Sequence, residues 1–236
     1  MSEDVAVELR LTEPADLLAH WFEPDLLLSQ TCGYPLLHAL KHRVRLVATP
    51  CYSAPGCQGA LYSSVWIVRD DDAAETLEDL RGRRAAFNAR DSQSGYNALR
   101  HAVAPLSLHG RFFGETIETG AHRLSMESVQ RGDADVAAID CVTFALAQDA
   151  GRTGGLRVLG RSQAVPSLPF ITSLQTTDVE LASLRRALEK VGQMDGVAPA
   201  LKAMRLTGFV TLKTSDYAPI AAMEASAIAA GYPVLA

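Results

Sequence analysis

The chain has 236 residues, of which 48% are hydrophobic and 21% are charged, and its formal net charge is −5. This is enough for an ordinary hydrophobic core in one large domain or in two small lobes. The acidic balance argues against nucleic-acid binding, which needs a basic surface, and no apolar run reaches the roughly 20 residues of a membrane span. A site for one small anion remains open, because local N–H groups and hydroxyls can outweigh the global charge.

Hydrophobic patterns and turn residues predict alternating helices and strands in the first half of the chain. In chain order we expect a helix at 14–20, a strand at 26–29, a helix at 35–40, strands at 44–48 and 61–69, a helix at 77–80, a strand at 85–88 and a helix at 96–103. Pro14 suits the first turn of the first helix, and Gly82 lies where a C-terminal cap belongs.

The same alternation continues in the second half. We expect a strand at 117–119, a helix at 124–131, a strand at 136–139, a helix at 143–150, a strand at 156–159, an extended segment at 166–169 leading into 170–173, and helices at 181–194 and 220–231. Strand–helix alternation over the whole length predicts an α/β protein with largely parallel sheets. No linker is visible, so two lobes would be joined by strands that cross between them.

Three polar clusters each follow a short apolar run and precede a predicted helix. They are the segments 91–97 (DSQSGYN), 119–122 (TGAH) and 137–140 (AAID). Hydroxyls and backbone N–H groups at a helix N-terminus bind anions, so these clusters predict a site for a small oxyanion. Plain helix capping by Ser92 or Ser94 is the alternative, and Gly95 would either let a ligand approach the backbone or form a simple turn.

His122 and Asp140 are the two titratable candidates. His122 lies beside the Thr119–Gly120 pair, where it could donate to an anion or stay a surface or packing residue. Asp140 ends an apolar strand, where pocket residues collect in open α/β sheets, but it could also cap the next helix. A carboxylate that faces an oxyanion favours a protonated or amine-bearing ligand.

Compartment and cysteine chemistry give weaker signals. The N-terminus shows no signal peptide, so we expect a cytoplasmic protein as the chain is written and a periplasmic one if a leader was removed. Cys51 and Cys57 bracket a Pro/Gly loop and could form a local disulfide, although reduced thiols are usual in the cytosol. Cys32 and Cys141 lie among apolar residues. No metal motif is present, and Cys32 has no visible base, so we predict no catalytic residue, metal or cofactor.

The chain resembles the phosphate, phosphite and phosphonate-type solute-binding proteins of ABC importers. The resemblance is carried by the order and spacing of the segments 26–35 (LLLSQTCGYP), 91–96, 119–122, 137–140 and 168–172. It extends from about Pro14 to about Thr211. It implies an α/β fold of the type II periplasmic-binding class, with two lobes, a two-strand hinge and a ligand cleft between the lobes.

Carried over to this sequence, the resemblance implies a first lobe made of residues 1–85 and 174–236 and a second lobe made of residues 86–173. The implied ligand-binding residues are Ser92, Gln93, Ser94, Tyr96, His122 and Asp140 in the second lobe and Thr31, Tyr34 and Tyr52 in the first. The implied function is capture of a small tetrahedral oxyanion for ABC-type uptake or sensing, with a permease as possible partner.

An enzyme is the alternative, because type II binding folds also host cytosolic biosynthetic enzymes. On this hypothesis the chain acts on a small anionic metabolite. Asp140 or His122 would be the acid or base, and Cys32 would be a pocket residue. Turnover of a bound ligand would favour this alternative over binding alone.

Overall fold

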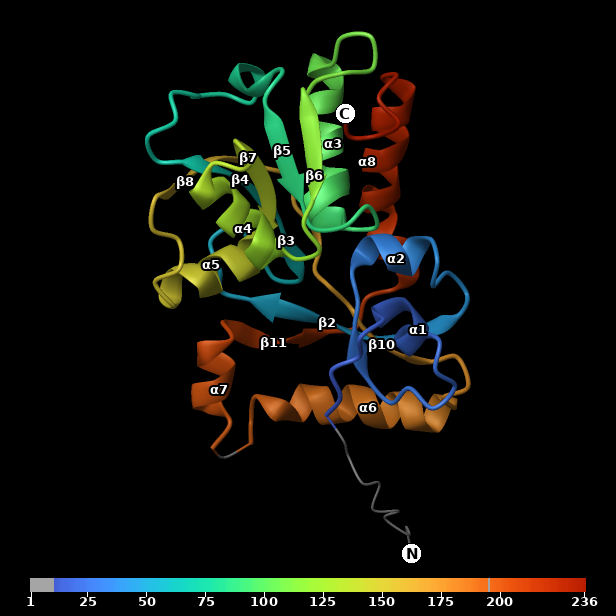
Figure 1. Ribbon diagram of the computed structural model, residues 1–236. Coiled ribbons are helices and arrows are strands. Elements are labelled where there is room, and N and C mark those ends of the chain that lie inside the picture. Colours follow the sequence, from blue (N-terminus) through green and yellow to red (C-terminus); the bar gives the residue numbers. More distant parts are fainter. Residues whose placement is uncertain (1–10, 195) are drawn as a thin grey trace, which may run out of the picture.

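The computed structural model describes residues 11–194 and 196–236. Its strands form a four-stranded sheet, a two-stranded sheet and a five-stranded sheet. The two larger sheets lie at opposite ends of the molecule and are each flanked by helices (Figure 1). This arrangement confirms the predicted α/β class with two lobes.

The lobe drawn at the bottom of Figure 1 contains the four-stranded sheet, in the order β1-β10-β2-β11. Its elements are α1 (Leu17–Trp21), β1 (Ser29–Gln30), α2 (Gly33–Leu37), β2 (Val44–Tyr52), β10 (Phe170–Ser173), α6 (Asp178–Val191), α7 (Ala198–Ala203) and β11 (Leu206–Val210). All three strand pairs of this sheet are antiparallel. Helix α6 packs on β2 and β11, and Leu181 of α6 is buried against Val47 and Ala48 of β2.

The upper lobe contains the five-stranded sheet, in the order β6-β5-β7-β4-β8, and the small β3-β9 pair. Its strands are β3 (Leu61–Tyr62), β4 (Ser64–Arg69), β5 (Arg84–Phe87), β6 (Glu115–Glu118), β7 (Val136–Asp140), β8 (Leu156–Arg161) and β9 (Val165–Pro166). Its helices are α3 (Ala98–Val103), α4 (His122–Arg131), α5 (Cys141–Asp149) and α8 (Ala218–Ala229). Short helical turns are η1 (Glu78–Leu80), η2 (Gln93–Asn97), η3 (Ala104–Leu106) and η4 (Thr214–Tyr217).

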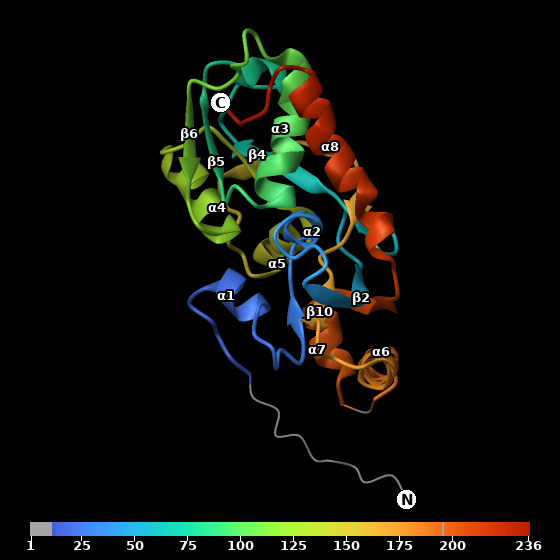
Figure 2. The same cartoon turned by 90° about the vertical axis from the view of Figure 1, so that its right-hand side faces the viewer.

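Strand β4 lies at the centre of the upper core because its apolar side chains alternate between two covered faces. Val65 and Ile67 face one hydrophobic cluster with residues of α4 and α5. Trp66 and Val68 face the other cluster, with residues of α3 and α8. All four are at most 2% exposed, and burying such side chains stabilises the fold by roughly 1.5–3 kcal/mol each. The helices α3 and α8 lie side by side on the sheet face to which Trp66 and Val68 point (Figure 2).

The expectation of largely parallel sheets was wrong. Among the strand pairs in the described residues, only β5–β6 and β5–β7 are parallel. Strand β4 is antiparallel to both β7 and β8, and Ser64 at its start pairs with Asp140 at the end of β7. The physical reason is connectivity: β4 carries the chain away from the lower lobe, whereas β5, β6 and β7 run back toward it.

The division of the chain into two lobes differs from the predicted residue ranges when it is made by sheet. The predicted boundary between residues 85 and 86 falls inside β5 and leaves β4, a strand of the same sheet, in the first lobe. Helix α8, near the C-terminus, packs on α3 of the upper lobe. We therefore propose to divide the lobes by sheet membership, with β3 to β9 and α8 in the upper lobe and the remaining strands in the lower one.

Some local predictions needed correction. Strand β11 and helix α7 were missed, and β11 contains Gly208 and a register irregularity in its pairing with β2. Helix α6 begins at Asp178 and not at 181, because Thr177 and Glu180 form a capping box. The helix expected at 96–103 opens with the π-helical turn η2. In residues 11–194 and 196–236, no helix combines the length and apolarity that membrane crossing requires.

Candidate functional site

Three polar side chains meet at one edge of the five-stranded sheet. Strands β5, β6 and β7 are parallel, so their carboxyl ends lie at the same edge. Ser94 lies in η2 after β5, His122 begins α4 after β6, and Asp140 ends β7. Ser94 Oγ is 2.9 Å from His122 Nε2, and Asp140 Oδ2 is 3.6 Å from the same nitrogen. The structure thus brings together three of the residues that the sequence nominated.

Gly95 permits this close approach. A Cβ atom added at Gly95 would lie 1.9 Å from Asn88 Oδ1 and 3.2 Å from His122 Cε1. No other residue type fits without moving one of these neighbours. The glycine therefore lets η2 pack directly against the histidine ring, which fixes Ser94 beside His122.

The two helices that start at this edge differ at their N-termini. The ten-residue helix α4 begins at His122, and its N-cap residue Ala121 gives no side-chain hydrogen bond to the first turn. Helix α5 is capped, because Asp140 Oδ1 accepts a hydrogen bond of 2.8 Å from the Thr143 N–H. The first-turn N–H groups of α4 are therefore the ones without a side-chain cap to accept their hydrogen bonds.

The environment of His122 favours the neutral ring. Burial lowers the pKa of His122 below its ordinary value, while the Asp140 carboxylate acts in the opposite direction. The side chain of His122 is 15% exposed and that of Asp140 is 6% exposed, and His122 is the ion-pair partner of Asp140 in the part of the chain that the structure describes. A neutral His122 ring therefore does not supply a full positive charge next to Asp140.

Tyr62, Cys32 and Tyr52 surround these residues. Burial raises the pKa of Tyr62 well above its ordinary value, and the neighbouring Cys32 and Asp140 add to this effect. Burial also raises the pKa of Tyr52, and Asp140 contributes in the same direction. Sequence reasoning nominated Tyr52 but missed Tyr62, for which the available signal was a polar residue inside the apolar pattern at 61–69.

Cys32 links the two lobes at this place. Its Sγ accepts a hydrogen bond of 3.2 Å from the backbone N–H of Gln93. Cys32 precedes α2 of the lower lobe, and Gln93 begins η2 of the upper lobe. Burial is the main cause of the raised pKa of the Cys32 thiol, which is therefore protonated at neutral pH. A protonated, buried thiol is a poor nucleophile.

Several buried polar atoms of this region have no hydrogen-bond partner in the described residues. They are Thr31 Oγ1, Tyr62 OH, Ser63 Oγ, His122 Nδ1 and Ser167 Oγ. Buried polar groups are nearly always hydrogen-bonded in native proteins, so a group of them is typical of a binding site. Thr31 was nominated from the sequence, whereas Ser63 and Ser167 were not.

Four nominated residues form hydrogen bonds elsewhere in the protein: Ser92, Gln93, Tyr96 and Tyr34. Ser92 Oγ caps η2 by accepting from the Gly95 N–H at 3.0 Å. Gln93 Oε1 accepts from Asn97, and its Nε2 contacts the sulfur of Met223. The hydroxyl of Tyr96 accepts from the Leu235 N–H at 3.0 Å.

Tyr34 donates a hydrogen bond to Glu224, which also pairs with Arg100 and His38. It therefore contributes to an ion-pair cluster between α2, α8 and α3, and it lies apart from the contacts made by Ser94, His122 and Asp140.

The geometry does not have the connectivity of a hydrolytic triad. In such a triad the serine and the carboxylate contact opposite nitrogens of the histidine. Here Ser94 and Asp140 both lie near Nε2. In residues 11–194 and 196–236, no group of three or more His, Cys, Asp or Glu side chains is arranged to hold a metal ion. The arrangement is suited to holding a ligand by hydrogen bonds.

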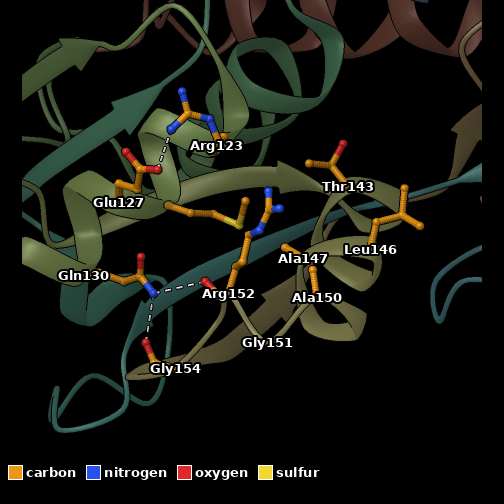
Figure 3. Close-up of a pocket in the computed structure, with 11 residues that line it drawn as sticks. Arg123, Glu127, Gln130, Thr143, Leu146, Ala147, Ala150, Gly151, Arg152 and Gly154 are labelled. Carbon is orange, nitrogen blue, oxygen red and sulfur yellow. Dashed lines mark hydrogen bonds and ion pairs between the residues drawn. The ribbon is translucent and has the colours of Figure 1, made fainter.

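A separate groove of about 590 Å³ lies between α4 and α5 (Figure 3). Its lining includes Arg123 and Glu127 of α4, which form an ion pair of 2.6 Å, and Thr143 of α5. Gln130 closes one end by donating hydrogen bonds to the carbonyls of Arg152 and Gly154. The first lining residues of the groove, Arg123 and Thr143, lie in the first turns of α4 and α5. The lining includes neither His122 nor Asp140.

The two α/β lobes, with a polar site at the carboxyl edge of the upper sheet, are the architecture of type II periplasmic-binding proteins, as the sequence predicted. Residues 23–217 match the model of a family described as the ABC transporter, phosphonate, periplasmic substrate-binding protein. The chain belongs to this family, whose members are substrate-binding components of ABC transporters. No curated protein sequence matches the chain.

Solved structures of low sequence identity share the fold. PhnD1 from Prochlorococcus marinus in complex with methylphosphonate has a TM-score of 0.74 at 14% identity, covering 88% of this chain and 80% of that one. The binding protein component of the ABC phosphonate transporter from Pseudomonas aeruginosa has a TM-score of 0.73 at 19% identity, covering 86% and 69%. XAC2383 from Xanthomonas citri, bound to ATP, has a TM-score of 0.68 at 17% identity, covering 91% and 82%.

Proposed function

We propose that this protein captures a small tetrahedral oxyanion, phosphonate-, phosphite- or phosphate-like, between its two lobes. Ser94, His122 and the N-terminus of α4 bind the oxyanion head, and Tyr62, Tyr52 and Thr31 line the site. No bond is made or broken. Binding is coupled to closure of the lobes, and the captured ligand is passed to an ABC permease for uptake or reported to a partner.

The observation that carries this proposal is the meeting of Ser94, His122 and Asp140 beside an uncapped helix N-terminus. Backbone N–H groups at a helix N-terminus point at a bound anion, and the helix dipole favours negative charge there. Among the described residues, the buried hydroxyls of Thr31 and Tyr62 have no hydrogen-bond partner, and each can donate to an oxygen of the ligand. Charge-assisted hydrogen bonds of this kind are about twice as strong as neutral ones.

The carboxylate of Asp140 selects the protonation state of the ligand. A fully ionised phosphonate would bring two negative charges next to a buried carboxylate whose ion-pair partner in the described residues is a histidine with a lowered pKa. A ligand with a P–OH proton or an amine donates a hydrogen bond to that carboxylate instead. We therefore expect a monoanion or an amine-bearing phosphonate to bind better than a dianion.

Calorimetric titration of the full chain tests this proposal. The ligands are methylphosphonate, phosphite, phosphate and ATP, the last because the Xanthomonas structure contains it. Binding of at least one of the three small oxyanions is the expected result. If all three fail to bind, or if ATP alone binds, the proposal of a small-oxyanion site is wrong.

A matched pair of variants on α5 tests the role of Asp140. Asparagine is as good an N-cap as aspartate, so Asp140→Asn keeps the cap of α5 and removes only the charge. The control is Asp149→Asn, at the other end of α5, where the carboxylate pairs with Arg205. Asp140→Asn should weaken binding of a monoanion at least tenfold, and Asp149→Asn should leave it unchanged. Equal affinity in both variants would contradict the assigned role of Asp140.

A further inference from the structure

Cys57 and Cys141 form a close pair of thiols that the proposed ligand site does not use. Cys57 lies in the loop between β2 and β3, and Cys141 is the first residue of α5, directly after Asp140. Their Sγ atoms are 3.4 Å apart. All four cysteines are free thiols, so the local Cys51–Cys57 bridge considered from the sequence is absent from the structure. The nearest thiol to Cys57 comes from a residue 84 positions away in sequence.

The loop packs closely on the first residue of α5 and is anchored to the end of β8. Gly56 has a φ of +104°, and a Cβ added there would lie 3.2 Å from Cys141 Cβ and 2.5 Å from Ser63 Oγ. Arg161 Nη1 donates a hydrogen bond of 2.8 Å to the Pro55 carbonyl. The backbone N–H of Cys141 donates a hydrogen bond of 3.0 Å to the Ser63 carbonyl. A disulfide bond is about 2.05 Å long, so the two sulfurs need to approach by only about 1.4 Å.

The two thiols differ in reactivity and access. The hydrogen bond between the two sulfurs lowers the pKa of Cys141 to about 7 and raises that of Cys57. A substantial fraction of Cys141 is therefore the nucleophilic thiolate at neutral pH. Cys141 is 1% exposed, so it reacts with an oxidant only if that oxidant is small. Cys57 is partly exposed and lies within reach as the resolving thiol.

We propose that Cys57 and Cys141 are a reversible redox site, which hydrogen peroxide oxidises to a disulfide that ties the 53–60 loop to the start of α5. The Cys141 thiolate attacks one peroxide oxygen, the O–O bond breaks, and the other oxygen leaves as hydroxide, which takes up a proton to form water. The product is a sulfenic acid on Cys141. Cys57 then attacks that sulfur, the S–O bond breaks, and the Cys57 proton leaves with the hydroxyl as a second water. The two sulfurs together lose two electrons, and the peroxide gains two.

This cross-link would bind the loop that follows β2 to the residue beside Asp140. It does not depend on the identity of the ligand, so it stands or falls separately from the proposed function. Its reversal needs a thiol or phosphine reductant, which returns both cysteines to the free form.

Mass spectrometry of the full chain, treated with hydrogen peroxide at neutral pH and then digested without reductant, tests the proposal. We expect the intact mass to fall by about 2 Da, the mass of two hydrogen atoms, and a peptide pair to link Cys57 to Cys141. Reduction should restore the original mass. The Cys57→Ser and Cys141→Ser variants should each lose the cross-link.

The matched control is the double variant Cys32→Ser, Cys51→Ser, which should still form it. The proposal is overturned if the linked peptides contain Cys32 or Cys51, or if Cys141 gains only oxygen atoms without cross-linking. It is also overturned if the Cys57→Ser variant loses the two hydrogen atoms as the parent protein does.

Discussion

Ser92 and Ser94 are two residues apart, yet they make different contacts, and replacing each with alanine tests the role that we propose for each. Ser92 Oγ accepts the Gly95 N–H at 3.0 Å and so caps η2. Ser94 Oγ lies 2.9 Å from His122 Nε2, beside Asp140. We therefore expect Ser92→Ala to change mainly the stability of the protein, and Ser94→Ala to change mainly its affinity for an oxyanion.

The magnitudes follow from the contacts that are lost. Removing an N-cap hydroxyl costs about 1 kcal/mol, which lowers the midpoint of thermal unfolding by about 2–4 °C in a protein of this size. Removing a hydroxyl that binds a charged ligand costs about 1.5–3 kcal/mol of binding free energy. Since about 1.4 kcal/mol corresponds to a factor of ten, Ser94→Ala should raise Kd roughly 10- to 140-fold.

The assays are differential scanning calorimetry for stability and isothermal titration with the best-binding oxyanion for affinity. Ser226→Ala, at an exposed position of α8, is the matched control and should change neither quantity. The reasoning is refuted if Ser92→Ala weakens binding as much as Ser94→Ala does, since the cap assignment would then be wrong. It is equally refuted if Ser94→Ala binds with the parent affinity.

Two further predictions concern the surroundings of His122. Since burial lowers its pKa, the unfolded chain binds more protons than the folded chain below about pH 6.5, and stability falls as the pH drops there by at most about 1.4 kcal/mol per pH unit. In urea titrations at several pH values, His122→Asn should flatten the dependence of unfolding free energy on pH. His109→Asn, at an exposed site, should retain that dependence. Equal pH dependence in the two variants would contradict the burial argument. Gly95→Ala places a Cβ 1.9 Å from Asn88 Oδ1, so we expect a loss of about 1–2 kcal/mol in stability together with weaker binding. Gly154→Ala, which meets no atom within 4 Å, is the control in the same urea assay, and an equally stable Gly95→Ala protein would show that Asn88 moves aside freely.

The convergence of three candidate residues could be predicted from the sequence because it depends on local order. Three polar clusters, each after a strand and before a helix, predict side chains at one sheet edge whenever those strands are parallel. Strands β5, β6 and β7 meet that condition, so Ser94, His122 and Asp140 converge as expected. The continuous apolar run of β4 likewise depends on residues that are close together in the chain.

Other residues could not be assigned from the sequence alone. Whether a serine caps a helix or faces a cavity depends on a displacement of its hydroxyl by a few ångströms within one turn. This is why Ser92 and Ser94 were given the same role. Tyr96 and Tyr34 carry polar groups at suitable positions, but both hydroxyls bond to the C-terminal region. The Leu235 N–H donates to Tyr96, and Glu224 accepts from Tyr34. These partners are more than 100 residues away, and no local pattern specifies them.

The sequence by itself determined the alternation of strands and helices, the class of the fold and the residues that gather at the end of β5, β6 and β7, because periodicity and turn chemistry are local properties. Only the tertiary structure decided the direction of β4, the place of Tyr62 beside Asp140 and the pairing of Cys57 with Cys141. Each of these depends on which distant segments share one core. That choice is made by the burial of apolar surface over the whole chain and not by any single segment.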